Sequence, residues 1–165
     1  MSAGTGQSVQ QNGAIAGAAA YVAGIVLTLL IGFAGLSGAF SLFVGFAPVV
    51  GTVSLYSMLH LWPHILGGTG LGSILVWTLL PVVVLVAAGY WVASTNDGGF
   101  TEGASVAIGY FVLSVIGFLV LLVMGNSSGG SATGDILAIG LGLLFTGIVF
   151  PVVFGGIGGL IAENA

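Results

Sequence analysis

The sequence predicts an all-α integral membrane protein, folded as a bundle of about five transmembrane helices. Only 2% of its 165 residues are charged, whereas a soluble domain carries about 25%. The mean hydropathy is +1.27, and long apolar stretches alternate with breaks rich in glycine, serine and asparagine. A membrane helix needs roughly 20 apolar residues, and each stretch meets that length. With so few charges the chain cannot cover its surface with polar groups, so it requires lipid as its solvent.

The chain contains no lysine, no arginine and no cysteine. Sites that hold retinal or pyridoxal phosphate as a Schiff base need lysine, and bidentate clamps for phosphate or carboxylate need arginine. Nucleic-acid binding through basic side chains is excluded for the same reason. Without cysteine there is no disulfide and no thiolate metal site. The lack of basic residues also removes the usual signal for membrane orientation.

The domain organisation is predicted to be simple, with a flexible N-terminal tail over residues 1–12 and one transmembrane helical domain over residues 13–165. The tail is rich in serine, glycine and glutamine. The first helix is predicted over residues 13–34. Small residues spaced by four in this segment favour close helix packing in lipid, and they are Ala16, Ala20 and Gly24.

The second helix is predicted over residues 39–62, after a short turn. Pro48 lies inside it and predicts a kink, because proline removes a backbone hydrogen bond and clashes with the preceding turn. If this segment is re-entrant and does not span the membrane, the bundle has four transmembrane helices.

The third helix is predicted over residues 74–93, with aromatic residues near both of its ends. Trp77 lies near one end, and Tyr90 and Trp91 lie near the other. Tryptophan and tyrosine are enriched where membrane helices meet the lipid headgroups. We therefore interpret these residues as interface anchors.

Residues 94–101 form the clearest polar loop of the sequence, and the fourth helix is predicted over residues 102–124. Thr101 is predicted to be the N-cap of this helix. Glu102 falls in the first turn, where a carboxylate suits the positive end of the helix dipole.

The fifth helix is predicted to start at Thr133 or Asp135 and to end near residue 162. Pro151 predicts a kink within it. Four residues spaced by four form a bare ridge on one face, and they are Gly147, Pro151, Gly155 and Gly159. We expect this ridge to be a helix-packing surface, and one hypothesis is that a second copy of the chain binds there. Five spans would place the two termini on opposite sides of the membrane.

The chemically distinctive side chains gather between residues 52 and 64. Thr52, Tyr56 and His60 are spaced by four, so they predict a polar stripe on one helix face. Such a stripe is expected to turn away from lipid, towards a polar cavity or binding site. The alternative is a polar cluster that anchors the chain at the membrane boundary.

A metal site at the two histidines is not expected. His60 and His64 are four residues apart, but Pro63 disfavours a continuous helix between them. No carboxylate lies nearby in sequence to complete a ligand set. Nucleotide-binding and hydrolase motifs are also absent, so we expect neither an enzyme nor a cofactor.

Three parts of the sequence carry a family resemblance. They are GAIAGAAAYVAG at residues 13–24, the aromatic–histidine stretch at residues 56–64, and LLPVVVLVAAG at residues 79–89 followed by EGASVAIGY at residues 102–110. Together they resemble a group of small haloarchaeal multi-pass membrane proteins of unknown function, some of them loosely labelled transporters. The resemblance implies a halophilic archaeon as the source. Members usually carry arginine or lysine near the first span, which this chain lacks, so no orientation is carried over.

Two classes of function follow from these observations. The first is a small transporter or channel subunit for small solutes or cations, with a path near the kinked second helix. Cations suit this class because every fixed charge of the side chains is acidic. The second is a non-transporting structural or assembly subunit of a membrane complex. The expected partners are the lipid bilayer of the cell membrane, crossed several times, and a second copy or another membrane subunit, but no nucleic acid.

Overall fold

Helices make up the part of the chain that the structure describes, namely residues 3–33, 71–127 and 142–165 of a computed structural model. A helix satisfies every backbone polar group within its own segment, which an apolar chain in lipid requires. The elements are α1 (Ala3–Phe33), α4 (Leu71–Thr95), α5 (Phe100–Ala104), α6 (Ala107–Ser127), the π-helical turn η1 (Phe145–Val149) and α8 (Phe150–Glu163). The predicted all-α class is confirmed for these residues.

Three of the helical stretches are long and apolar enough to cross a membrane. They are Ser8–Thr28, Phe100–Val120 and Gly142–Glu163. A shorter apolar stretch, Leu79–Thr95, belongs to α4, which has 25 residues in all. The second predicted helix, residues 39–62, lies outside the described residues.

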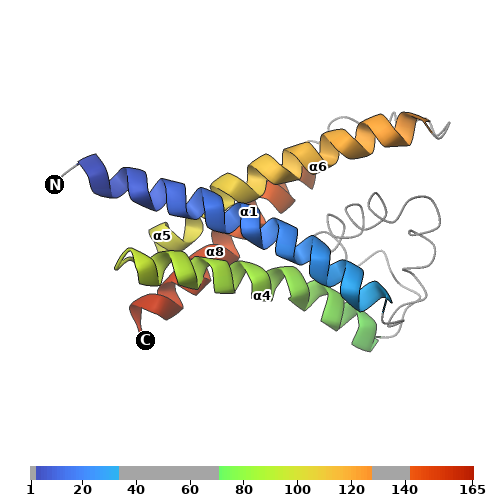
Figure 1. Cartoon of the computed structure of the whole chain (residues 1–165). Coiled ribbons are helices and arrows are strands. Elements are labelled where there is room, and N and C mark those ends of the chain that lie inside the picture. The colour runs from blue at the N-terminus through green and yellow to red at the C-terminus, as the bar shows by residue number, and fades with distance from the viewer. Residues whose placement is uncertain (1–2, 34–70, 128–141) are drawn as a thin grey trace.

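The described helices alternate in direction along the bundle (Figure 1). The amide nitrogen of the Asn12 side chain donates a hydrogen bond to the Asn96 side-chain oxygen at 3.3 Å, which joins the first part of α1 to the turn after α4. Glu163, the last residue of α8, lies beside Gly99 of the same turn. The beginning of α1 and the end of α8 therefore share one end of the bundle. The expectation that five spans place the two termini on opposite sides of the membrane stays a prediction, and this arrangement does not favour it.

Helix α1 begins at Ala3, so it includes residues 3–12, which the sequence analysis assigns to a tail. At about 1.5 Å per residue, its 31 residues extend about 46 Å, which is longer than the hydrocarbon core of about 30 Å. No proline interrupts this first part, and the polar side chains of Ser8, Gln10 and Gln11 are exposed. The bond from Asn12 to Asn96 gives this polar part a packing partner.

Both prolines of the described helices are buried, and one of them coincides with a change in helix type. Pro81 lies inside α4, and Pro151 is the second residue of α8. The π-helical turn Phe145–Val149 ends two residues before Pro151 and contains Gly147, the residue four positions before this proline. In a regular α-helix the ring of a proline collides with the carbonyl group of the residue four positions before it, and a wider turn relieves this collision. The distortion predicted at Pro151 is thus a π-helical turn.

Glycines bring the backbones of α1 and α6 into direct contact. A Cβ atom at Gly17 would overlap the carbonyl group of Val106, and one at Gly109 would overlap the carbonyl group of Ala14. Small residues allow such close approach between helices in lipid, where van der Waals packing drives association. Beside this crossing, the buried rings of Tyr21 and Tyr110 meet edge to face, with their centroids 5.2 Å apart.

Helix α8 is packed on two sides through glycines. A Cβ atom at Gly158 would overlap the carbonyl group of Val86 in α4. A Cβ atom at Gly103 in α5 would overlap the carbonyl oxygen of Gly155, and it would lie 2.8 Å from the Cα atom of Gly159. All these glycines of α8 are buried. The position of α8 therefore depends on residues that have no side chain.

Replacing Gly89 with leucine should test this packing. A side chain at Gly89 in α4 would overlap the Gly155 backbone, so Gly89→Leu is expected to lower the free energy of unfolding by about 1–3 kcal/mol. Ala87 lies two residues away on the exposed face of the same helix. Ala87→Leu is the matched control and should change that free energy by less than about 0.5 kcal/mol. Unfolding by sodium dodecyl sulfate in detergent, followed by circular dichroism, measures both; equal losses would contradict this packing.

Candidate functional site at the acidic end of the bundle

The candidate polar cavity predicted from the sequence cannot be assigned a place in this structure. Its three residues, Thr52, Tyr56 and His60, lie outside the described residues. So does the second histidine, His64. The cavity remains a prediction.

The small-residue ridge of the fifth predicted helix faces the interior of this same chain. Pro151, Gly155 and Gly159 are buried, and Gly147 lies in the buried part of η1. A Cβ atom at Gly147 would meet the Phe111 ring of α6 at 2.9 Å. Gly155 and Gly159 meet α5 and the turn before it. A second copy of the chain would find the ridge already covered, so the hypothesis that this ridge makes the subunit contact does not fit the fold.

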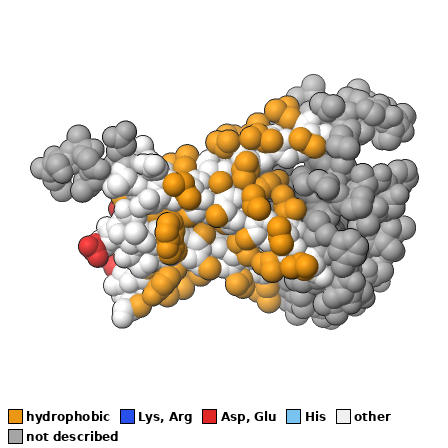
Figure 2. Space-filling model, viewed as in Figure 1, with side chains coloured by type: hydrophobic (Ala, Val, Ile, Leu, Met, Phe, Trp, Pro, Cys, Tyr) orange, Lys and Arg blue, Asp and Glu red, His pale blue; other side chains and the backbone are white. Residues whose placement is uncertain are grey.

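Three of the four acidic side chains of the protein lie at the end of the bundle where α1 begins and α8 ends. They are Asp97, Glu102 and Glu163, and Figure 2 shows acidic side chains gathered at this end, next to a face covered by hydrophobic ones. A charge is costly in lipid. Asp97 and Glu163 are exposed and Glu102 is half-buried, so these residues make this the acidic end of the bundle.

The turn between α4 and α5 is fixed by hydrogen bonds to the last turn of α4. The backbone N–H of Gly98 donates to the carbonyl oxygen of Ala93 at 3.0 Å, and the Asn96 side chain donates to the carbonyl oxygen of Val92 at 2.7 Å. Asp97 between them has a φ of 48°. This left-handed conformation is usual just after a helix, where glycine is the commonest residue and aspartate is tolerated.

Glu102 closes the same turn from the other side. Its carboxylate accepts a hydrogen bond from the backbone N–H of Gly99 at 2.8 Å, the return half of a capping box. The helix starts at Phe100, directly after Gly99. The prediction that Thr101 is the N-cap is therefore wrong: Thr101 is the second residue of α5, and its side chain is exposed. The helix starts two residues earlier than Glu102 because that side chain reaches back to Gly99.

Glu163 approaches Gly99 from α8. A Cβ atom at Gly99 would overlap the Oε2 atom of the Glu163 side chain, so this carboxylate lies directly against Gly99. Two carboxylates of unlike elements, Glu102 and Glu163, thus flank one glycine. The chain has no lysine or arginine to balance them, so cations from the solution must do so.

The described residues offer little reactive chemistry. Among them, no three histidine, aspartate or glutamate side chains stand close enough together to hold a metal ion. The buried hydroxyl groups of Thr28, Ser114 and Thr146 each donate to the carbonyl oxygen four residues earlier in their own helix. A hydroxyl group bonded in this way finds its hydrogen-bond partner within its own helix and needs none from another helix. The acidic end is consequently a site for electrostatic and structural contacts.

Sequence reasoning missed Gly99 and the link between Asn12 and Asn96. Two carboxylates converge on Gly99, and only Glu102 is close to it in sequence. The pair of glycines directly before Phe100 was the available signal for a close approach. Asn12 and Asn96 are 84 residues apart, and no local pattern connects them.

Replacing Glu102 should test its capping bond. Glu102→Ala removes the acceptor for the Gly99 N–H, so the free energy of unfolding should fall by about 1 kcal/mol. Glu102→Gln keeps an acceptor oxygen of the same reach and should retain most of that stability. Chemical unfolding of the two variants in parallel gives the difference. If Glu102→Gln loses as much as Glu102→Ala, the charge of the carboxylate and not its hydrogen bond stabilises the turn.

Comparison with known proteins gives one match. Residues 50–165 match a family described as a family of unknown function, DUF7978. The match covers α4 to α8, including the acidic turn and the glycine contacts of α8. No curated protein and no solved structure matches the chain. Because the match includes well over half of its residues, the chain belongs to the family of unknown function DUF7978.

Proposed function

We propose that this protein is a multi-pass protein of the cell membrane that serves as a structural or assembly subunit. The observation that carries the proposal is the direct backbone contact of α8 with α4 and α5 through glycines. Such contacts hold helices at one fixed separation, which suits a scaffold. The resemblance to small haloarchaeal membrane proteins is part of the same proposal.

The proposed number of membrane crossings is even, with four as the preferred count. The crossings would be made by α1, by α4, by α5 with α6, and by η1 with α8. At about 1.5 Å per residue, the 25 residues of α4 reach about 38 Å, which is enough for the core. The shared end of the α1 start and the α8 end supports an even count (Figure 1). Five crossings would separate them.

Transport of small solutes or cations is the second class that the sequence raises. A charged solute needs polar partners along its path. In the described interior the buried hydroxyls of threonine and serine already bond to their own helices, and the carboxylates lie at the acidic end. These observations favour the structural class. A transport path would depend on Thr52, Tyr56 and His60.

Cysteine labelling should test the even number of crossings. The chain contains no cysteine, so single substitutions need no altered background. Ser8→Cys, Thr95→Cys and Asn164→Cys introduce exposed thiols near the beginning of α1 and the ends of α4 and α8. A membrane-impermeant maleimide added to sealed vesicles should label all three from the same side. Labelling of Ser8→Cys and Asn164→Cys from opposite sides would favour five crossings.

Solute flux should separate the two classes of function. A structural subunit, reconstituted alone in proteoliposomes, should give no flux above that of empty vesicles across a panel of cations and small neutral solutes. Flux that His60→Ala abolishes and His64→Ala retains would overturn the structural proposal and assign the path to the predicted polar stripe. The second variant controls for removal of a histidine as such.

A further inference from the structure

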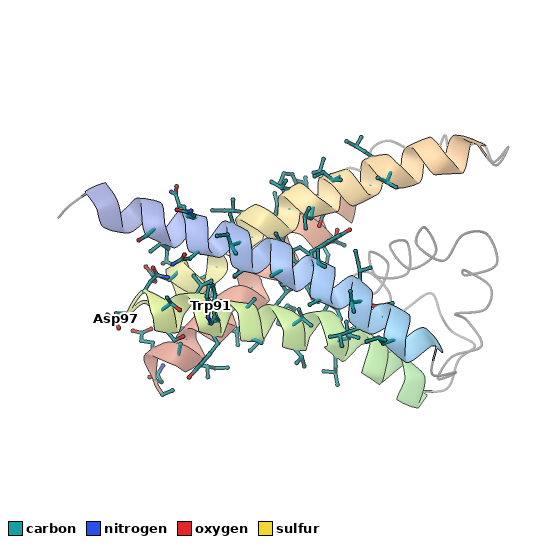
Figure 3. All side chains as sticks on the ribbon, viewed as in Figure 1. Trp91 and Asp97 are labelled. Carbon is teal, nitrogen blue, oxygen red and sulfur yellow. The ribbon has the colours of Figure 1, made fainter. Side chains whose placement is uncertain are left out.

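Three exposed aromatic side chains lie beside the acidic end. Tyr90 and Trp91 belong to the last turns of α4, and Phe100 is the first residue of α5; their exposed fractions are 41%, 49% and 42%. Figure 3 shows Trp91 set back from Asp97, towards the middle of the bundle. The aromatic side chains therefore lie between the acidic turn and the apolar length of the helices.

On three helices the exposed side chains change from apolar to polar near this end. The change runs from Ile15 to Gln11 on α1, from Trp91 to Ser94 on α4, and from Ile161 to Glu163 on α8. Each change takes about one helical turn. Three helices thus each mark a boundary between apolar and polar exposed side chains.

The three changes occur at a common level of the bundle. The hydrogen bond from Asn12 to Asn96 holds the polar part of α1 against the turn after α4. The Glu163 carboxylate lies against Gly99 in the same turn, which brings the end of α8 to that level. Figure 2 shows the result on one face, with the carboxylates at the end and hydrophobic side chains next to them.

We propose that this level binds the headgroup layer of a lipid bilayer, with Tyr90 and Trp91 in that layer and the acidic turn in water. The inference rests on the proposed membrane location and adds the depth at which Tyr90 and Trp91 lie in the bilayer. The tyrosine hydroxyl and the indole N–H donate hydrogen bonds to lipid ester or phosphate oxygens, while the rings contact the acyl chains. Phe100 has no polar group and lies on the acyl side of the same layer.

The distribution of exposed residues favours lipid over a protein as the occupant. A protein partner covers one patch, whereas the change from apolar to polar occurs on three different helices. Large apolar side chains also remain exposed along the helices, while glycines make the closest contacts between helix backbones. An apolar exterior with small residues at the helix interfaces is typical of helices packed in lipid.

The depth of Trp91 can be measured by its fluorescence. The chain has three tryptophans, so Trp62→Phe with Trp77→Phe leaves Trp91 alone in place. The matched control carries these two changes with Trp91→Phe and Val83→Trp. Val83 is 61% exposed on the same helix, and eight residues place it about 12 Å deeper than Trp91. Both proteins are reconstituted in phosphatidylcholine vesicles whose acyl chains carry bromine either near the headgroup or near the chain end.

The proposal predicts that the shallow bromine quenches Trp91 more strongly, and that the deep bromine quenches the tryptophan at position 83 more strongly. Stronger quenching of Trp91 by the deep bromine would overturn the inference and leave the membrane location intact. Quenching at position 83 with none at Trp91 would also overturn it, because a protein surface or water would then cover Trp91. No quenching of either protein would contradict the membrane location itself.

Discussion

Backbone contact between glycines of α5 and α8 is the interaction on which the described bundle depends. Lipid tails are as apolar as leucine, so burial of apolar surface does little to hold membrane helices together. What remains is van der Waals contact, which falls off steeply with distance. Gly103, Gly155 and Gly159 allow this contact at the shortest separation. Because Gly89 of α4 also meets the Gly155 backbone and Gly158 meets Val86 of α4, the same kind of contact places α4, α5 and α8 relative to one another.

The scarcity of polar groups follows from the same solvent. Thr28, Ser114 and Thr146 are buried, and each hydroxyl bonds to its own helix, so none of them requires a partner across a helix interface. The described carboxylates lie at one end, where Glu102 accepts a hydrogen bond from Gly99 and Glu163 lies beside it. The π-helical turn η1 accompanies Pro151 and is covered by α6 through Gly147. Polar and irregular features thus occur where the bilayer tolerates them.

The sequence predicts the helices well because their cause is local. Long apolar runs between turn residues indicate helices near residues 74–93 and 102–124, and α4 and α6 lie there. The helix ends were less predictable, since they depend on side chains that reach back or across. The sequence predicts Thr101 as a cap, but the Glu102 carboxylate caps a helix that starts at Phe100. Helix α1 begins at Ala3, and Asn12 within this earlier part bonds to Asn96, a partner that no local pattern reveals.

The ridge at Gly147 and Gly155 shows a second limit of sequence reasoning. Spacing by four places both residues on one helix face, but it does not identify the surface that this face meets. Here α5 and α6 of the same chain cover the ridge. The polar stripe at Thr52, Tyr56 and His60 is known only from its spacing and stays a prediction. The function is harder to predict from the sequence than the fold, because the described residues make packing contacts and carry charges but form no cluster of reactive side chains.

A double-mutant cycle at Gly103 and Gly155 tests the central claim most directly. The two residues share one backbone contact, so Gly103→Ala alone should already separate α5 from α8. Adding Gly155→Ala to this variant should then lower the free energy of unfolding much less than Gly155→Ala lowers it in the wild-type chain. Residues in contact show coupling energies of about 0.5–3 kcal/mol, and the free energies of unfolding of the four proteins should give a value in that range. Losses that add to within about 0.3–0.5 kcal/mol would place the two glycines at independent sites and contradict the glycine contact as the basis of the bundle.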